Sequence, residues 1–197
     1  MNTFWEEKHE AQDNYWLTGS LAHDILNMHR IPADISYTSA LDIGVGFGHL
    51  IRFFHQQKKT VYACDISPVA LSNVRSMTTG TYVTAELASA PPVDLAICHL
   101  VFQHCIDTEI HRIIRDVNLT PTGTFSFQFA FLRDGEPLKP KVKELIQLGT
   151  HHFRSLDTIK RMVDDSNKEI VAVSAPIHYN AEENFSWLFV RVKNKSP

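Results

Sequence analysis

The sequence lacks long hydrophobic runs. Its 197 residues contain no uninterrupted apolar segment close to the roughly 20 residues that a membrane-spanning helix needs. The start of the chain is charged and aromatic, so it also lacks the apolar core and the small-residue cleavage site of a secretory signal. We therefore expect a water-soluble, cytoplasmic protein with no membrane partner, and the length favours one domain with at most a small appendage.

Cysteine is scarce, and no pattern of metal ligands is present. The three cysteines, Cys64, Cys98 and Cys105, are odd in number and have no C-x-x-C spacing, so they are predicted to be buried thiols in a reducing compartment. The 11 histidines form no H-x-x-x-H or H-E-x-x-H pair, and no metal site is expected. The net charge of -3 comes without a basic stripe, which argues against a nucleic-acid partner.

Short apolar runs alternate with amphipathic ones from residue 39 onward, which predicts a parallel sheet with crossover helices. The last two apolar runs, 169–177 and 184–192, are joined by a short polar loop without a helix and are therefore expected to pair antiparallel. Residues 1–38 are expected to form a helical lead-in or lid, and 132–154 has no clear period; both are expected to cover the strand ends. The other strands are predicted at 39–44, 60–65, 81–87, 93–100 and 123–131, and the helices at 49–57, 69–77, 107–118 and 155–166.

A glycine-rich turn separates the first strand from the first helix. Gly44, Gly46 and Gly48 recur at every second position, and such a turn brings backbone N–H groups and the positive end of a helix dipole against a ligand. In a parallel sheet this turn lies at the carboxyl ends of the strands, where ligands bind. Asp65 ends the second strand, at about the 20-residue spacing from which a carboxylate can accept hydrogen bonds from both hydroxyls of a ribose.

Two classes of ligand share this geometry. The dinucleotide fingerprint G-x-G-x-x-G would place its third glycine at position 49, which is His49 here. The chain instead has D-x-G-x-G-x-G, with Asp42 leading. This pattern resembles the first motif of the class I S-adenosylmethionine-dependent methyltransferases, and the segments "LDIGVGFGHL", "VYACDISPVALSNVR", "VDLAICHLVFQHC" and "NLTPTGTFSFQF" follow in the order typical of that family.

The resemblance implies a fold, a cofactor and an activity. The fold would be a Rossmann-like three-layer sandwich whose seven-stranded, mostly parallel sheet has the order 3-2-1-4-5-7-6 and an antiparallel last strand. Residues 39–197 would form the domain that binds S-adenosylmethionine. The implied activity is methyl transfer to a small molecule at oxygen or nitrogen. The alternatives are an NAD-dependent oxidoreductase and a non-catalytic subunit that binds the cofactor.

The resemblance also implies cofactor contacts, position by position. Asp65 would hold the ribose hydroxyls, Ile66 would pack on the adenine, and the acidic position toward the adenine amino group falls near Glu86. The residues implied to bind the cofactor are Asp42, Gly44, Gly46, Gly48, Asp65, Ile66, Glu86, Leu87, His99 and Leu100.

Histidines are the candidates for catalysis. If the acceptor is a hydroxyl, a general base is useful, and imidazole, with an ordinary pKa of about 6.5, suits that task. The resemblance places His104 in a segment near the transfer site, so His104 is the first candidate and His99 the next. Alternatively, His104 caps or packs the helix that follows it.

Four further residues are candidates for substrate contact. Tyr15 and Trp16 could close over the cofactor, or they could fix the lead-in helix to the sheet. His151 and His152 follow the irregular segment and could contact the substrate or form an exposed loop pair. The fourth strand is not followed by N/D-P-P-Y/F, the sequence often found in methylases of base or glutamine amide nitrogens, so methylation of DNA bases is disfavoured. The oligomeric state is left open.

Overall fold

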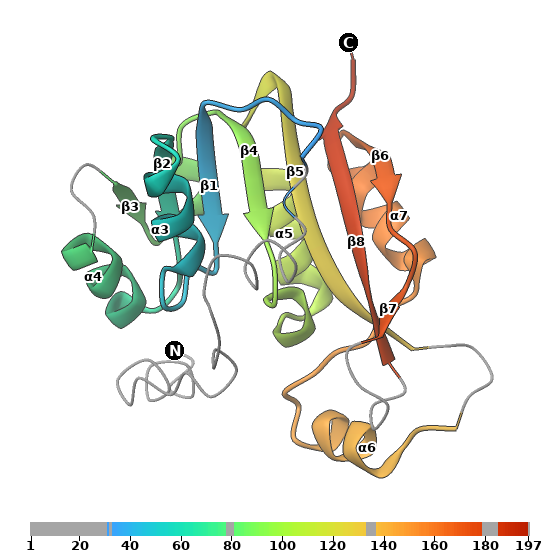
Figure 1. Ribbon diagram of the computed structural model, residues 1–197. Coiled ribbons are helices and arrows are strands. Elements are labelled where there is room, and N and C mark those ends of the chain that lie inside the picture. The colour runs from blue at the N-terminus through green and yellow to red at the C-terminus, as the bar shows by residue number, and fades with distance from the viewer. Residues whose placement is uncertain (1–30, 32, 78–80, 133–136, 179–184, 197) are drawn as a thin grey trace. The chain divides into compact units, whose positions relative to one another are not determined.

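The computed structural model of the protein describes residues 31, 33–77, 81–132, 137–178 and 185–196. Most of the predicted lead-in, including Tyr15 and Trp16, lies outside these residues. The chain divides into two compact units, of which the first ends at Ile97 and the second begins at Cys98. Figure 1 labels the strands and helices of each unit. The division into a lead-in and one cofactor-binding domain stays a prediction.

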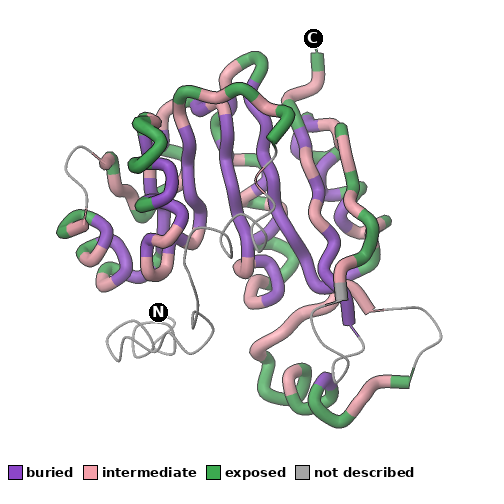
Figure 2. Tube along the Cα trace, viewed as in Figure 1, coloured by how far each residue is buried: buried purple, intermediate pink, exposed green. Residues whose placement is uncertain are grey.

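Parallel pairing holds the strands of the first unit together. β1 (Ser39–Ile43) pairs with both β2 (Thr60–Cys64) and β4 (Val93–Cys98), and β3 (Tyr82–Thr84) pairs with β2. Strands of a parallel sheet that are buried on both faces have nearly continuous apolar sequences, as β4 has. Figure 2 shows that β1 and β4 are buried along most of their length.

Helices follow β1 and β2 in this unit. They are α3 (His49–Gln56) and α4 (Pro68–Met77), and a 3-10 helix (Leu87–Ser89) precedes β4. Burying an aliphatic or aromatic side chain contributes about 1.5–3 kcal/mol, so the core of this unit firmly fixes the helix that follows the glycine turn. The residues that α3 contributes to this core are Leu50, Ile51, Phe53 and Phe54.

An antiparallel ladder dominates the second unit. β5 (Leu119–Leu132) pairs with β8 (Phe185–Asn194), and β8 also pairs with β6 (Lys168–Val173) and with the two-residue β7 (Ile177–His178). Successive side chains of a strand point to opposite faces. One face of β5 therefore carries three phenylalanines, and the other carries a polar pair and an alanine; all six are buried: Phe125, Phe127, Phe129, Ser126, Gln128 and Ala130.

The helices of the second unit are α5 (Asp107–Asp116), α6 (Pro140–Gln147) and α7 (Leu156–Asp165), with a 3-10 helix at Phe102–His104. Ser155 caps α7, since its Oγ accepts a hydrogen bond from the Thr158 backbone N–H at 3.2 Å.

The strand order confirms the predicted fold. The sheet runs β3-β2-β1-β4-β5-β8-β6, with β7 beside β8, and its last strands are antiparallel. This is the predicted Rossmann-like order 3-2-1-4-5-7-6, in which β8 is the predicted seventh strand. Within the described residues the sheet has eight strands instead of seven, because the predicted strand at 169–177 is divided into β6 and β7.

The predicted boundaries are wrong in several places, each for a physical reason. The strand at 169–177 divides after Val173, and Pro176, which precedes β7, has no N–H for the ladder. A register shift between Ile170 and Ala172 also makes β6 itself irregular. The strand at 81–87 ends early, since Thr84 Oγ1 accepts a hydrogen bond from the Glu86 backbone N–H at 3.0 Å and the chain turns there. The segment at 132–154 contains α6, which is only two turns long and buries a single residue, Val142.

No disulfide joins the cysteines in the described part of the chain. Cys64 and Cys98 are buried and Cys105 is half-buried, and burial raises the pKa of the Cys105 thiol to about 12. Within the described residues, no three histidine, cysteine, aspartate or glutamate side chains are grouped so that they could hold a metal ion. None of the described helices has the length and apolar character needed to cross a membrane.

Candidate functional site

The glycine turn connects β1 to α3 through left-handed backbone. The φ angles are 77° at Gly44, 47° at Gly46 and 73° at Gly48, a region that side chains other than glycine rarely tolerate. At Gly48 an added Cβ would also lie 3.2 Å from both the Met77 Sδ and the Val74 Cγ2 atoms. The sequence therefore needs glycine there both for the backbone angle and for the packing of α4 against the turn.

Asp65 ties this turn to the end of β2. Its Oδ2 accepts a hydrogen bond from the Gly46 backbone N–H at 3.0 Å, and its Oδ1 accepts one from the Ser67 backbone N–H at 2.8 Å. The carboxylate is nearly buried, and each of its oxygens has a further lone pair. Asp65 thus fixes the shape of the turn and keeps acceptor capacity for the hydroxyl groups of a ligand.

Asp42 is the second buried carboxyl group of this region. It lies at the end of β1, opposite Ala63 of β2 and Ile97 of β4. Burial, and secondarily the charge of Asp65, raises the pKa of Asp42 to about 8. A cation bound beside it would favour its ionised form, because opposite charge lowers the pKa of a carboxyl group.

The other predicted cofactor residues of the first unit lie in the loops after β2 and β3. Ile66 follows Asp65 directly and is 66% exposed, an unusual position for isoleucine and one that suits contact with an apolar ligand surface. Glu86 and Leu87 follow β3, whose Thr84 carbonyl accepts a hydrogen bond from the Asp65 backbone N–H at 3.4 Å. Their cofactor contacts stay predictions.

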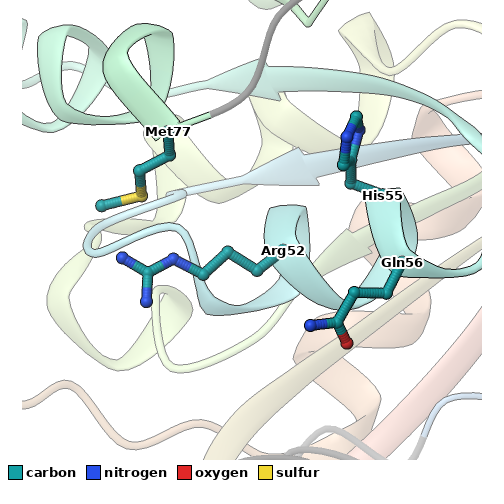
Figure 3. Close-up of a pocket in the computed structure, with 4 residues that line it drawn as sticks. All are labelled: Arg52, His55, Gln56 and Met77. Atoms are coloured by element: carbon teal, nitrogen blue, oxygen red, sulfur yellow. The ribbon is translucent and has the colours of Figure 1, made fainter.

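A separate surface hollow lies on the first unit. It is lined by Arg52, His55 and Gln56 of α3 and by Met77 at the end of α4 (Figure 3). The three α3 residues are exposed, on the side of the helix opposite its buried apolar face. None of the predicted site residues lines this hollow.

In the second unit, the residues that follow β4 are held by contacts with β5 and β8. His99 Nε2 lies 3.2 Å from Ser126 Oγ, and the His99 ring contacts Phe189 edge to face, with the ring centroids 5.1 Å apart. His99 is therefore a buried residue with a structural partner. Its predicted roles in cofactor binding and catalysis stay predictions.

Leu100 has a strained backbone. Its φ is 59°, and the other described non-glycine residues with positive φ, Lys58 and Asn167, lie just after the ends of α3 and α7, where such angles are common. Left-handed backbone costs a non-glycine residue roughly 1–2 kcal/mol. Such strain is often found at functional sites. Here it ends β4 two residues earlier than the sequence predicts, and the Leu100 side chain packs against a buried cluster that includes Phe185.

The structure brings His104 together with the segment 150–152. His104 Nδ1 lies 2.6 Å from the Thr150 carbonyl oxygen, and the rings of His104 and His151 contact edge to face at 5.0 Å. The His152 backbone N–H donates to the Gln103 carbonyl oxygen at 2.6 Å. Burial lowers the pKa of His104 to about 4, although the Thr150 carbonyl acts in the opposite direction, and burial also lowers the pKa of His151. Both imidazoles are therefore neutral near pH 7.

Arg154 secures this arrangement, and the sequence gives no signal for it because a single arginine in a loop has no distinguishing pattern. Its guanidinium is almost fully buried. It donates to Asp107 Oδ1 at 2.7 Å, to the Phe102 carbonyl at 3.0 Å, to the His152 carbonyl at 3.2 Å and to the Cys105 carbonyl. Arg154 thereby fastens the segment 150–154 to residues 102–107.

The chain was compared with models of protein families, with curated proteins and with solved structures. Residues 40–120 match the model of a methyltransferase domain, and no curated protein matches the chain. The fold is similar to that of 1,6-didemethyltoxoflavin-N1-methyltransferase from Burkholderia thailandensis, with a TM-score of 0.69 and 13% identity over 98% of this chain and 87% of that one. That enzyme was solved with 1,6-didemethyltoxoflavin and S-adenosylhomocysteine bound.

Two further structures have the same fold. An S-adenosylmethionine-dependent methyltransferase from Clostridium acetobutylicum has a TM-score of 0.64 and 13% identity, over 99% of this chain and 100% of that one. The mitomycin 7-O-methyltransferase MmcR has a TM-score of 0.66 and 15% identity, and the match covers 98% of this chain but 60% of that one. At such identities the likeness concerns the fold alone.

Proposed function

We propose that this protein is a class I S-adenosylmethionine-dependent methyltransferase that methylates a small molecule at an oxygen or nitrogen atom, and the match of residues 40–120 to a methyltransferase domain supports this proposal. The observation that carries the proposal is the turn of three left-handed glycines with the Asp65 carboxylate bonded to Gly46. The similar folds include both an N-methyltransferase and an O-methyltransferase, which supports either acceptor atom.

The residues of the first unit fit the cofactor. At Gly48 an added Cβ would lie only 3.2 Å from side-chain atoms of α4, and glycine at positions 44, 46 and 48 leaves backbone that a ligand can approach closely. Asp65 would bind the ribose hydroxyls with its remaining lone pairs, and the exposed Ile66 would contact the adenine. Asp42 would lie near the positively charged part of the molecule, where a cation stabilises its ionised form. When bound, the cofactor supplies an electrophilic methyl group on a sulfonium.

The dinucleotide alternative fits these residues less well. The third glycine of a dinucleotide motif permits close packing of helix against strand, and His49 takes its place as the first residue of α3. The match of residues 40–120 to a methyltransferase domain also argues against an oxidoreductase.

Positioning accounts for most of the proposed rate enhancement. Methyl transfer from a sulfonium is an in-line displacement, and holding two reactants in alignment can lower the barrier by roughly 7–11 kcal/mol. The residues that hold the cofactor and the acceptor therefore matter more than any group that exchanges protons. A direct catalytic role for His104 or His99 stays a prediction.

The proposal can be tested with S-adenosylmethionine labelled in its methyl group and a panel of small phenols, amines and nitrogen heterocycles. We expect label in at least one acceptor, and a rate about tenfold lower in Asp65→Asn, because the asparagine loses the charge and one acceptor oxygen. Asp165→Asn, an exposed change in α7, should leave the rate unchanged. Binding of S-adenosylhomocysteine without transfer to any panel member would instead identify a non-catalytic subunit.

A further inference from the structure

A buried carboxamide in the second unit ends in an oxygen without a partner. Gln103 lies in the 3-10 helix after β4 and is 3% exposed. Among the described residues, no donor lies within hydrogen-bond distance of its Oε1. Such an oxygen has lost its water without gaining another donor, which is rare in folded proteins and calls for an explanation.

The other end of the same carboxamide is held in place by His104. The Thr150 carbonyl can only accept, so His104 Nδ1, at 2.6 Å from it, must carry the proton. In the neutral imidazole the lone pair is then on Nε2, which lies 3.0 Å from the Gln103 Nε2 amide. The amide therefore donates to His104, and this bond fixes which way the Gln103 oxygen points.

The chain of hydrogen bonds has a direct consequence for His104. A general base needs a free lone pair to take a proton. The only lone pair of the neutral His104 ring is used by Gln103, and its N–H is used by Thr150. This geometry favours a role in which His104 orients its neighbour.

Aromatic rings gather beside this carboxamide. His151 contacts the His104 ring at a centroid distance of 5.0 Å and lies nearly parallel to Phe153, with an interplanar angle of 27°. Phe153 in turn contacts Phe185 at 5.3 Å. In this aromatic cluster (His104, His151, Phe153 and Phe185), Phe185 is buried. His151 and Phe153 are only half-buried, so part of these two rings is available for contact with a further flat ring.

We infer that the Gln103 carboxamide oxygen accepts a hydrogen bond from the hydroxyl or amino group of an aromatic methyl acceptor, and that His104 is the positioning residue for this carboxamide. The inference rests on the proposed function, because it names the class of acceptor. Gln103 binds and orients the acceptor and takes no proton from it. A neutral acceptor is favoured, since the carboxamide and both neighbouring imidazoles are neutral.

Phenol and anisole are suitable probes because they share a ring and differ in the O–H group. Their binding is measured by NMR titration of the protein, with and without S-adenosylhomocysteine. We expect the wild-type protein to bind phenol about tenfold more tightly than anisole, since only phenol supplies the missing donor. Equal affinity for the two probes, or no binding of either at millimolar concentration, would overturn the inference.

Variants of the two residues separate recognition from folding. Gln103→Met keeps the length of the side chain without its oxygen, and it should reduce the preference for phenol to near unity. His104→Gln places a carboxamide oxygen where the imidazole Nε2 was, so it can still accept from Gln103 and should keep most of the preference. His104→Leu has no acceptor for the Gln103 amide and should lose the preference for phenol. A preference that persists in Gln103→Met, or an equal loss in both His104 variants, would contradict the assignment.

Two controls keep failures distinguishable. His111→Asn changes a half-buried histidine of α5, a helix that begins three residues after His104, and should leave the preference for phenol unchanged. Thermal unfolding of every variant shows whether it is folded. If the phenol preference behaves as expected but S-adenosylhomocysteine does not bind, the recognition site stands and the proposed methyl transfer fails.

Discussion

At the scale of single residues, Asp42 and Asp65 show how one side-chain type serves two purposes. Asp65 accepts two backbone hydrogen bonds, one from Gly46 in the glycine turn and one from Ser67. Asp42 is buried beside it, and its pKa is raised to about 8. The Asp65 carboxylate shapes the glycine turn, whereas Asp42 becomes fully charged near pH 7 only with help from a cation.

Asp42 predicts a dependence of stability on pH. Because the pKa of this carboxyl in the folded protein is about 8 and its ordinary value is 3.8, its contribution to stability should fall as the pH rises from about 4 to about 8. Asp42→Asn is neutral at every pH and should avoid this loss. At pH 8, without ligand, its free energy of unfolding should be higher by about 1 kcal/mol or more, or about 2–4 °C in Tm.

The measurement is the Tm of the wild-type protein and of Asp42→Asn between pH 5 and pH 8. Asp165→Asn, which alters an exposed carboxylate, is the control. The same Asp42→Asn variant should bind the cationic S-adenosylmethionine more weakly, since it cannot become negative. A difference in Tm that stays constant across this pH range would contradict the assigned pKa.

A site residue can be predicted from the sequence only if it belongs to a recognisable local pattern. Asp42, the three glycines and Asp65 lie in a local pattern with fixed spacing, so the sequence predicts their association and the hydrogen bond from Gly46 to Asp65 agrees with it. Gln103 and Arg154 act through atoms that lie about 50 residues away along the chain or on a neighbouring side chain. No local sequence pattern predicts such contacts.

At the scale of elements, the side chain of Arg154 holds the segment 150–154 against residues 102–107. Arg154 Nε and both terminal nitrogens are bonded to residues 102–107, and its backbone N–H donates to the Ala130 carbonyl at 3.0 Å. The same segment contains Thr150 and His151, which contact His104. The geometry around His104 therefore depends on a side chain that touches neither imidazole by hydrogen bonding.

Arg154→Met should destabilise the second unit. The change leaves the Phe102 and Cys105 carbonyls without this donor, and losing a buried charge-assisted hydrogen bond typically costs about 1.5–3 kcal/mol. The free energy of unfolding of Arg154→Lys should lie between those of the wild-type protein and Arg154→Met, since an ammonium group lacks the planar, forked set of donors of a guanidinium. Urea unfolding measures the effect. Arg161→Met, an exposed change in α7, is the control. If Arg154→Met lowers the free energy of unfolding by less than about 0.5 kcal/mol, as ordinary surface substitutions do, Arg154 does not hold the segment 150–154 in place.

Element prediction succeeded where periodicity was strong and failed where tertiary contacts decide. The strongly amphipathic helices α3, α5 and α7 are confirmed at the predicted places. By contrast, α6 is short, and its one fully buried residue, Val142, belongs to a cluster built with β5 and β8. A two-turn helix of this kind depends on that packing, which the sequence pattern does not contain.

At the scale of the whole molecule, the strand order could be predicted because the alternation of apolar and amphipathic runs allows few topologies. Parallel connections need a crossover, and too few residues separate the last two apolar runs for one, so the antiparallel end of the sheet follows from the sequence. The resemblance to a known family supplied the order itself, and the observed order agrees with it.

The central claim is that the glycine turn of this chain binds S-adenosylmethionine and not a dinucleotide. Isothermal titration calorimetry with S-adenosylhomocysteine, and separately with NAD, tests it most directly. We predict one binding event per chain for S-adenosylhomocysteine, weakened by about 1.5–3 kcal/mol in Asp65→Asn, and no binding of NAD. Binding of NAD without binding of S-adenosylhomocysteine would contradict the account.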